Sequence, residues 1–416
     1  MSLVLEPTDL EMLNGQHGAA CQFAMKLVVQ YAQMLDATSL ISVVGAHIDG
    51  CLYHGQASLD FAQHLVKLGG MVCVPTTLNV ASLDRLHPNL YRGDTNTATQ
   101  ARALMDAYEA LGCTPTWTCA PYQLPNRPAL GEQIAWAESN AIVFANSVLG
   151  ARTNRYGDFL DICAAITGRV PDVGLHQTAN RRGQIVFSLE QVSPAWLEDG
   201  VLCTLLGFMV GKIAGSSIPV LLGLPSGTTE DDLKALGATS ASSGRVAMFH
   251  AVGITPEAPS LVAALQDQAP EQTIFITDTD LQEALNRLNT LAVGAELTAI
   301  SLGTPHFSLA EFARLMPLLT GWQCHPALEF LVSTNRSTLA QLEENGWLQE
   351  LKRFGVQIVV DTCTYITPIL RQAGGAVMTN SGKWAHYAPA NLGVTVAFGS
   401  LRDCVRSAVE GRVWRE

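Results

Sequence analysis

The sequence predicts an α/β protein with mostly parallel sheets, and three observations lead to this class. Short apolar runs alternate with longer stretches of helical periodicity along most of the chain. The 35 glycines and 19 prolines are spread between these runs as turn signals. Hydrophobic residues make up 48% of the 416 residues and charged residues only 15%, so the chain has much apolar surface to bury.

The N-terminal half shows this alternation first. Pro7-Thr8-Asp9 is a helix start signal, and the apolar run at 40–45 ends in glycine, as a buried strand does. In order, the pattern predicts helices over 7–36, a strand at 40–45, a helix at 57–69, a strand at 71–76, a helix at 97–112, a short strand and loop at 114–122, and helix or buried strand at 133–145 and 158–168. Helices of this length between strands are typical of a mostly parallel sheet.

The C-terminal half continues the pattern after an apolar, glycine-rich stretch at 207–223. Its predicted elements are a helix at 229–236, a strand at 246–250, a helix at 259–266, a strand at 273–276, a helix at 279–290, a strand at 298–302, a helix at 308–318, a strand at 329–332, a helix at 336–345 and a strand at 357–360. Because 416 residues exceed the size at which one core stops growing, we expect several domains. We place them at 1–206, 207–293 and 294–416.

Composition argues against two classes of partner. The net charge is −12, and the basic residues form no block, which disfavours nucleic-acid binding. The longest apolar stretches, such as 41–46 and 218–224, are too short to span a bilayer. The N-terminus lacks the pattern of a signal peptide, so we expect a cytoplasmic protein.

The ten cysteines are irregularly spaced and are expected to be buried thiols or metal ligands rather than disulfides. Burial is the simplest reading for most of them, namely Cys21, Cys51, Cys73, Cys113, Cys163, Cys203 and Cys404. No CxxC pair, phosphate-binding glycine motif or nucleophile elbow is present. Cysteines at separate strand ends can still hold one iron–sulfur cluster together.

Polar residues follow many of the apolar runs, where parallel sheets bind their ligands. The loops concerned are 46–50, 75–79, 118–122, 137–155, 303–308, 333–336, 361–363 and 379–387. Each alone can be an ordinary turn or helix cap. Arg152 and Arg155, among several amides and hydroxyls, suit a bidentate carboxylate site, although a salt-bridged surface loop is the alternative. Cys119, beside Pro121 and outside a helix, is expected to be more exposed than a core cysteine, although a packed small hydrophobe is the favoured interpretation for this segment taken alone.

Seven stretches resemble the aconitase X family, and the resemblance covers nearly the whole chain. They are AHIDGCLYHGQASLDFA, VPTTLNVASLD, IAWAESNAIVFANSVLGARTNRYGDFLDI, GTPHFSLAEF, VSTNR, DTCTYITP and VMTNSGKWAHYAPANLG. The resemblance implies three α/β/α domains of the aconitase type around an iron–sulfur cluster. It also implies a fourth, swivelling domain, fused or separate, which supplies a catalytic serine. We find no swivel domain in the sequence and expect a small partner subunit.

By position, Cys119 and Cys363 match the family's cluster-ligand loops. The family's third cysteine corresponds here to Thr304, so the resemblance leaves open a smaller cluster such as 2Fe-2S, a mononuclear iron, or a substitute ligand such as Cys324 or His325. The residues expected to contact substrate are His47, Asp49, Thr77, Asn79, Asn146, Ser147, Arg152, Thr304, His306, Ser381 and Lys383. Lys383, His47 and Ser147 are the expected catalytic groups.

The resemblance implies a dehydratase acting on a small carboxylate, with two known activities. Asp49 suits the amine of cis-3-hydroxy-L-proline, which is the favoured substrate, dehydrated to Δ1-pyrroline-2-carboxylate. Mevalonate 5-phosphate is the alternative. A third hypothesis is a non-catalytic binding or regulatory protein, motivated by Thr304.

Overall fold

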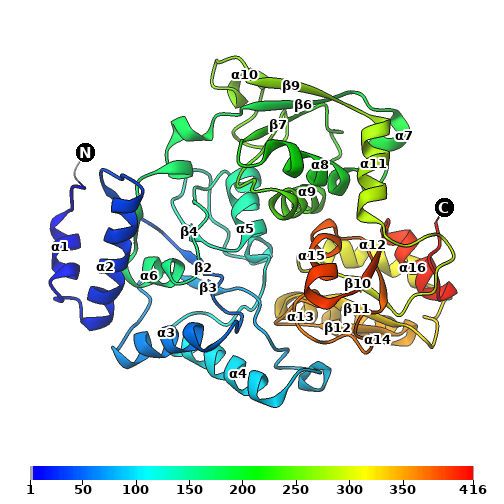
Figure 1. Ribbon diagram of the computed structural model, residues 1–416, viewed down its shortest axis with the longest axis horizontal. Helices are drawn as coiled ribbons and strands as arrows, with labels where there is room; N and C mark the ends of the chain where they lie inside the picture. The colour runs from blue at the N-terminus through cyan, green and yellow to red at the C-terminus, as the bar shows by residue number, and fades with distance from the viewer. Residues whose placement is uncertain (1–2, 416) are drawn as a thin grey trace. The chain divides into compact units, whose positions relative to one another are not determined.

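The computed structural model describes residues 3–415 and divides into two compact units. The first comprises Met1–Leu83 and Asp94–Arg182, and the second comprises Asp84–Gly93 and Gly183–Glu416. Within the described residues three sheets are parallel and a fourth, two-stranded sheet is antiparallel, which confirms the predicted α/β class (Figure 1). The domain boundaries proposed at 206 and 293 stay a prediction.

The first unit is built from small elements. They are α1 (Pro7–Leu13), α2 (Ala19–Met34), β1 (Leu40–Ser42), β2 (Ala46–Ile48), α3 (Gln56–Lys67), β3 (Thr76–Leu78), α4 (Thr95–Ala110), η2 (Pro121–Gln123), β4 (Ala135–Trp136), α5 (Ser139–Phe144), the π-helical turn η3 (Ala145–Leu149), α6 (Leu160–Thr167), β5 (Arg169–Pro171), η4 (Gly174–His176) and η5 (Thr178–Arg181).

The second unit carries the longer sheets. Its elements are η1 (Pro88–Leu90), β6 (Ile185–Gln191), α7 (Pro194–Leu197), α8 (Leu202–Ala214), β7 (Pro219–Leu222), α9 (Glu230–Ser243), β8 (His250–Ala251), α10 (Leu261–Ala264), β9 (Gln272–Thr277), α11 (Asp278–Leu288), β10 (Ala299–Leu302), α12 (Leu309–Leu319), β11 (Glu329–Ser333), α13 (Arg336–Glu344), α14 (Trp347–Phe354), β12 (Val356–Val359), β13 (Ala376–Thr379), α15 (Gly382–Leu392), β14 (Thr395–Phe398) and α16 (Leu401–Glu410).

The strands of the first unit do not lie where the apolar runs predicted them. The run at 40–45 forms β1 only to Ser42, which pairs antiparallel with β5, and the parallel sheet β3-β2-β4 starts at Ala46. The run at 71–76 is coil until β3 begins at Thr76. Hydrogen-bond partners decide where a short strand ends, and periodicity does not contain that information. His47 and Thr77 therefore lie inside strands rather than in loops.

The first sheet of the second unit packs against two helices that lie side by side (Figure 1). The strand order is β8-β7-β6-β9, and all pairs are parallel. Glycines let α8 and α9 approach closely: a Cβ on Gly207 would lie 2.4 Å from the carbonyl oxygen of Leu236. A Cβ on Gly211 would lie 2.6 Å from the carbonyl oxygen of Ser240.

The second sheet of this unit has the order β12-β11-β10-β13-β14, with every pair parallel. Its core is rich in aromatic side chains, including Phe307, Phe312, Phe330 and Phe354. Because all five strands run the same way, the loops after β10, β11, β12 and β13 share one edge of the sheet. These are four of the polar loops that the sequence pointed to.

Residues 84–93 belong to the second unit although the chain on either side belongs to the first. The carboxylate of Asp84 accepts a hydrogen bond of 2.9 Å from the backbone N–H of Val360. Leu90 packs with Leu331, Val359 and Ile369 in a separate apolar cluster. This segment thus covers one side of the five-stranded sheet.

Most of the cysteines that were expected to be buried are buried. Cys21, Cys51, Cys113, Cys163, Cys203 and Cys404 are buried, as expected. Cys73 is exposed, so its expected burial was wrong; it lies in coil before β3 instead of in a strand. Among residues 3–415, no helix is long and apolar enough to cross a membrane.

Candidate active site

His47 and Thr77 face each other on neighbouring strands. They are register partners of β2 and β3, and the distance from His47 Nδ1 to Thr77 Oγ1 is 2.8 Å. Burial lowers the pKa of His47 to about 3, against the opposing effect of a backbone hydrogen bond at Thr118. The ring is therefore a neutral imidazole at physiological pH, able to donate at one nitrogen and accept at the other.

Asp49 and Asn79 meet at the carboxyl ends of the same two strands, where the Asn79 amide donates to the Asp49 carboxylate. The backbone N–H of Asp49 donates to Asp161 Oδ2 at 2.7 Å. Asp161 is fully buried, and burial raises its pKa to about 7. Sequence reasoning missed Asp161, because nothing in the run GDFLDI separates a buried aspartate from a first-turn helix residue.

Asn146 and Ser147 lie on η3, a π-helical turn, and both are buried. The Asn146 amide donates to the carbonyl of Thr153 at 2.9 Å and accepts from the N–H of Thr153 at 3.0 Å. Arg181 adds bonds of 3.1 Å to Asn146 Oδ1 and 2.8 Å to the Asn146 carbonyl. The amide nitrogen and the amide oxygen of Asn146 thus both form hydrogen bonds with the protein's own backbone. Single π-helical turns are frequent at functional sites.

Arg181 itself was missed by the sequence analysis. Its side chain is fully buried, whereas Arg182 beside it is half-buried. Two adjacent arginines look alike in sequence, so no local signal separates them. Arg152, which was expected to bind substrate, donates from Nη1 to the carbonyl of His176 at 3.1 Å. Its buried Nε has no hydrogen-bond partner among residues 3–415.

Cys119 lies in the loop before η2 and is only 2% exposed, so its expected exposure was wrong. The loop is covered by α5: Asn140 donates to the Cys119 carbonyl at 2.9 Å and accepts from the Tyr122 hydroxyl at 2.6 Å. Tyr122 also stacks on Phe144, with ring centroids 3.8 Å apart. A proline-containing loop looks open in sequence, but these long-range contacts close it.

In the second unit, Thr304 and His306 follow β10, and both are buried. His306 Nε2 lies 3.2 Å from the carbonyl oxygen of Thr362, and burial lowers the pKa of His306 to about 4. The Thr304 hydroxyl is buried and has no hydrogen-bond partner among the described residues. An unsatisfied buried hydroxyl is costly, which indicates that a ligand or ordered water completes it.

Cys363 follows β12 and is 1% exposed. The backbone turns just before it, because Asp361 has a φ of 62°, in the left-handed region. Arg336, the first residue of α13, binds that carboxylate. The contact between His306 and Thr362 brings the loops after β10 and β12 together at the carboxyl edge of the sheet.

Cys324 and His325 cannot replace a ligand at this edge. They precede β11, and Cys324 packs against Gly355, which precedes β12, whereas Cys363 follows β12. They therefore lie at the amino edge of the sheet, a strand length of roughly 15 Å away at about 3.3 Å per residue. The suggested substitution is wrong.

Ser381 and Lys383 begin α15. Ser381 caps the helix, accepting from the N–H of Trp384 at 3.0 Å, and its hydroxyl donates to the carbonyl of Thr304. Lys383 is 3% exposed, and its Nζ lies 5.8 Å from the ring centroid of Tyr365. The loops after β10 and β13 are thus joined by a direct hydrogen bond.

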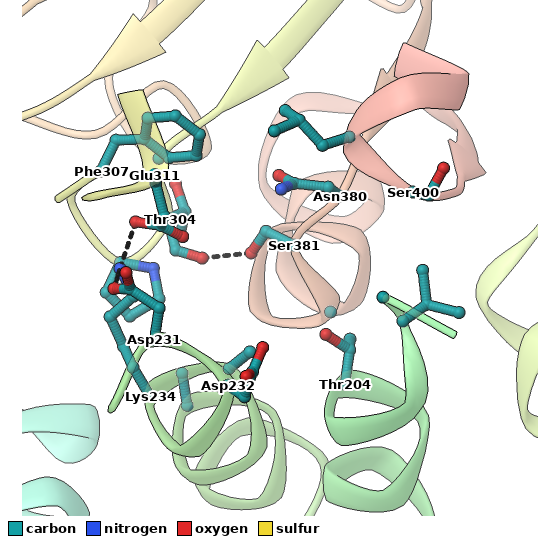
Figure 2. A pocket seen from close by; sticks show the side chains of 18 of the residues that line it. Thr204, Asp231, Asp232, Lys234, Thr304, Phe307, Glu311, Asn380, Ser381 and Ser400 are labelled. Carbon is teal, nitrogen blue, oxygen red and sulfur yellow. Dashed lines mark hydrogen bonds and ion pairs between the residues drawn. The ribbon is translucent and has the colours of Figure 1, made fainter. Parts of the chain in front are cut away.

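A cavity of about 290 Å³ opens beside these loops within the second unit (Figure 2). Thr304 and Ser381 line one part of it, and Thr204, Asp231 and Lys234 from α8 and α9 line another. Figure 2 shows Ser381 and Thr304 joined by their hydrogen bond among the lining side chains. Two of the residues expected to contact substrate therefore border a cavity of small-molecule size.

Three buried side chains carry donor atoms of kinds that bind iron. Cys119, His306 and Cys363 are buried, and each offers one ligand atom to a metal. Thiolates are the usual ligands of iron–sulfur clusters, and imidazole also binds iron. Asp361 and the Thr362 carbonyl fix the surroundings of Cys363 and His306, as outer partners of metal ligands commonly do.

Family models for all three domains of aconitase X match the chain. The first domain matches residues 2–179, the second 183–286 and the third 297–410. The chain belongs to the aconitase X family, which confirms the resemblance seen in the sequence.

Three relatives and one solved structure are similar to this chain over nearly its whole length. It is 43% identical to cis-3-hydroxy-L-proline dehydratase of Hypocrea jecorina, over 99% of this chain and 69% of that protein. It is 41% identical to the enzyme of the same name from Pseudomonas aeruginosa, over 98% of this chain and 70% of that protein. The phosphomevalonate dehydratase large subunit of Methanothermobacter thermautotrophicus is 33% identical, over 97% and 98%. The crystal structure of Thermococcus kodakaraensis aconitase X (holo-form) matches with a TM-score of 0.87 and 30% identity, over 98% of this chain and all of that one.

Proposed function

We propose that this protein is a hydro-lyase that dehydrates cis-3-hydroxy-L-proline to Δ1-pyrroline-2-carboxylate. The observation that carries the proposal is the identity of 43% and 41% to two enzymes of that name across nearly the whole chain. The phosphomevalonate dehydratase large subunits reach 31% to 33%. A part-buried Asp49–Asn79 pair at a strand end also suits an amine-bearing substrate better than a phosphate ester.

In this proposal Cys119 and Cys363 hold an iron centre, with His306 or Thr304 as the neighbouring donor. The buried cysteine and histidine donors support iron. The number of ligands found by experiment would distinguish a small iron–sulfur cluster from a single iron. When bound, iron supplies a Lewis acid for the leaving hydroxyl on the carbon β to the carboxylate. The unsatisfied hydroxyl of Thr304 is consistent with a ligand at that position.

The chain's own side chains take the remaining roles. Arg152 has an uncommitted Nε and would bind the substrate carboxylate, together with the hydroxyl of Ser147. Asn146 would act indirectly, since its amide already holds Thr153 and Arg181. The Asp49 carboxylate would receive the substrate's ring ammonium. His47, which is neutral, would hold or relay protons, and so would Lys383, since both are buried groups able to donate.

We also propose a small partner subunit. The cis-3-hydroxy-L-proline dehydratases match over 69% and 70% of their length, so each carries additional chain. The relatives that match over 97% to 100% of their length are named large subunits. The second fact supports a small partner subunit, which we propose to be the swivelling part that supplies the serine base for the α-proton.

One alternative is a phosphomevalonate dehydratase large subunit, since two relatives of that name are 33% and 32% identical over 98% of their own length. The experiment is to co-express this chain with its small subunit, purify the complex without oxygen and supply each substrate in turn. We expect Δ1-pyrroline-2-carboxylate from hydroxyproline and no product from mevalonate 5-phosphate. Turnover of the phosphate ester alone would overturn the proposed substrate. An iron-free, inactive complex would instead support a non-catalytic protein.

A further inference from the structure

Lys234 is a buried cation on α9 that none of the roles above uses. Its side chain is 3% exposed, and it forms ion pairs with Asp231 at 2.8 Å and with Glu311. Figure 2 shows it at the border of the cavity, opposite Ser381. The two carboxylates come from different parts of the chain, since Asp231 shares α9 with Lys234 and Glu311 lies on α12.

The same group reaches the loop that carries Thr304 and His306. Lys234 Nζ lies 3.5 Å from the carbonyl oxygen of His306. Glu311 accepts from the N–H of Ser308 at 2.8 Å, and the Ser308 hydroxyl donates to Asp231 Oδ2 at 2.7 Å. Lys234 and its two carboxylates therefore fasten the C-terminal end of the loop to α9.

The loop is fastened at its other sides by neutral bonds. Ser381 donates to the Thr304 carbonyl, and Thr334 donates to the Phe307 carbonyl at 2.7 Å. The N–H of Phe307 donates to the carbonyl of Ser333 at 2.9 Å. Each bond comes from another strand-end loop or helix of the second unit, so the conformation of Gly303–Phe307 is fixed from several directions.

Stability alone is a weak explanation for such a cluster. Buried ion pairs lose much solvation energy, and well-packed apolar replacements are often equally stable. Burial alone would lower the pKa of Lys234, but Glu311 and Asp231 outweigh it and raise that pKa, so the group stays an ammonium. What a charged cluster provides, and an apolar one does not, is a fixed direction for the atoms that it binds.

We propose that Lys234 is a positioning residue for the dehydration reaction, which sets the loop Gly303–Phe307 so that Thr304 and His306 hold their working geometry. This inference rests on the proposed function. It assigns Lys234 no contact with substrate; it acts through Glu311 and through the His306 carbonyl.

The test compares four forms of the complex: wild type, Lys234→Met, Glu311→Gln and the double variant. Methionine keeps much of the length of lysine without its charge, and glutamine keeps the acceptor for Ser308. We expect each single variant to lower kcat per iron about 10–100-fold, as small misplacements of catalytic groups do, with KM changed less than about threefold. The double variant should be no slower than the slower single one, because both act through one loop. Lys212→Met, on the exposed face of α8, is the matched control.

A merely structural role predicts a different result. It lowers the melting temperature but leaves kcat per iron unchanged at temperatures well below it, and that outcome overturns the proposal. If Lys234→Met does not fold, Glu311→Gln decides alone. The wild type reports separately on the proposed function, and whichever substrate it turns over serves the comparison. If it turns over neither, crystal structures of the wild type and Lys234→Met decide: a loop Gly303–Phe307 displaced by about 1 Å or more supports the proposal, and an unmoved loop refutes it.

Discussion

Arg336 donates two parallel hydrogen bonds to the carboxylate of Asp361, from Nε to Oδ1 at 2.7 Å and from Nη2 to Oδ2 at 2.6 Å. The aspartate is fully buried, its backbone is in the left-handed region, and it stands two residues before Cys363. The geometry of this bidentate pair therefore fixes where the chain turns toward the proposed iron ligand.

Replacing Arg336 by alanine should destabilise the protein by about 2–3 kcal/mol. This is below the ~3–5 kcal/mol typical of a fully buried pair, because the Arg336 side chain is 36% exposed. Chemical unfolding measures the change. Arg336→Lys keeps the charge but loses one of the two parallel bonds, and should fall between the wild type and the alanine variant. A lysine variant as stable as the wild type would show that charge alone is sufficient.

Cysteine substitutions test the proposed ligands. Cys363→Ala and Cys119→Ala should each remove iron and abolish turnover, because both thiols are proposed to bind it. Cys324→Ala should change neither quantity, since Cys324 lies at the opposite edge of the sheet. The measurement is the iron content per chain after anaerobic purification. An undiminished iron content in Cys363→Ala would refute the proposal that Cys363 binds the iron.

Three buried histidines should make stability depend on pH. Burial lowers the pKa of His47 to about 3, and that of His176 and His306 to about 4 each. Because the unfolded histidines bind protons below about pH 6.5, stability is full above that pH and falls as the pH drops toward 4. At pH 5 the loss should be on the order of 2 kcal/mol for each histidine.

His47→Gln should remove its share of this loss. The comparison is the change in free energy of unfolding between pH 7 and pH 5, in this variant and in the wild type. His64→Gln, on the exposed side of α3, is the control and should behave as the wild type does. An equal pH dependence in all three proteins would show that the imidazole of His47 is not held neutral.

Arg181 and Asn146 should prove to be structural partners. Arg181 donates to the carbonyls of Asn146, Ala151 and Leu175 and to the Asn146 amide oxygen, so its planar fork is used fully. Arg181→Lys keeps the charge but cannot reproduce this fan of bonds, and we expect a loss of about 2–4 kcal/mol. Asn146→Ala should lower stability as well as activity. A stable Asn146→Ala variant with raised KM would instead restore the direct substrate role that the sequence suggested.

The sequence predicted the parts of the site that one parallel sheet brings together. Thr304, Arg336, Cys363 and Ser381 follow β10, β11, β12 and β13, and the strand order puts all four loops at one edge. This follows from the polarity of parallel strands alone. Helix starts were also readable, because Thr229, Thr277 and Ser308 each form a capping box that the sequence shows.

What the sequence could not give are contacts between distant residues. The burial of Cys119 depends on Asn140 and Tyr122, and the depth of Arg181 depends on carbonyls up to 35 positions away. In the first unit the strands are only two or three residues long, which is too short for periodicity to fix their ends. Lys234 is another case, since a lysine in the second turn of a helix normally reads as solvent-exposed.

The segment at residues 84–93 has a consequence for how the molecule is made. Asp84 leaves the ribosome 276 residues before its partner Val360, and Leu90 emerges long before Leu331, Val359 and Ile369. Contacts of such long range close late, so this sheet edge should be among the last parts to fold during synthesis. A fragment cut after Arg182 would carry Leu90 without its apolar partners, and a fragment beginning at Gly183 would lack Asp84. The second unit is therefore complete only in a piece of chain that also contains residues 94–182 of the first unit.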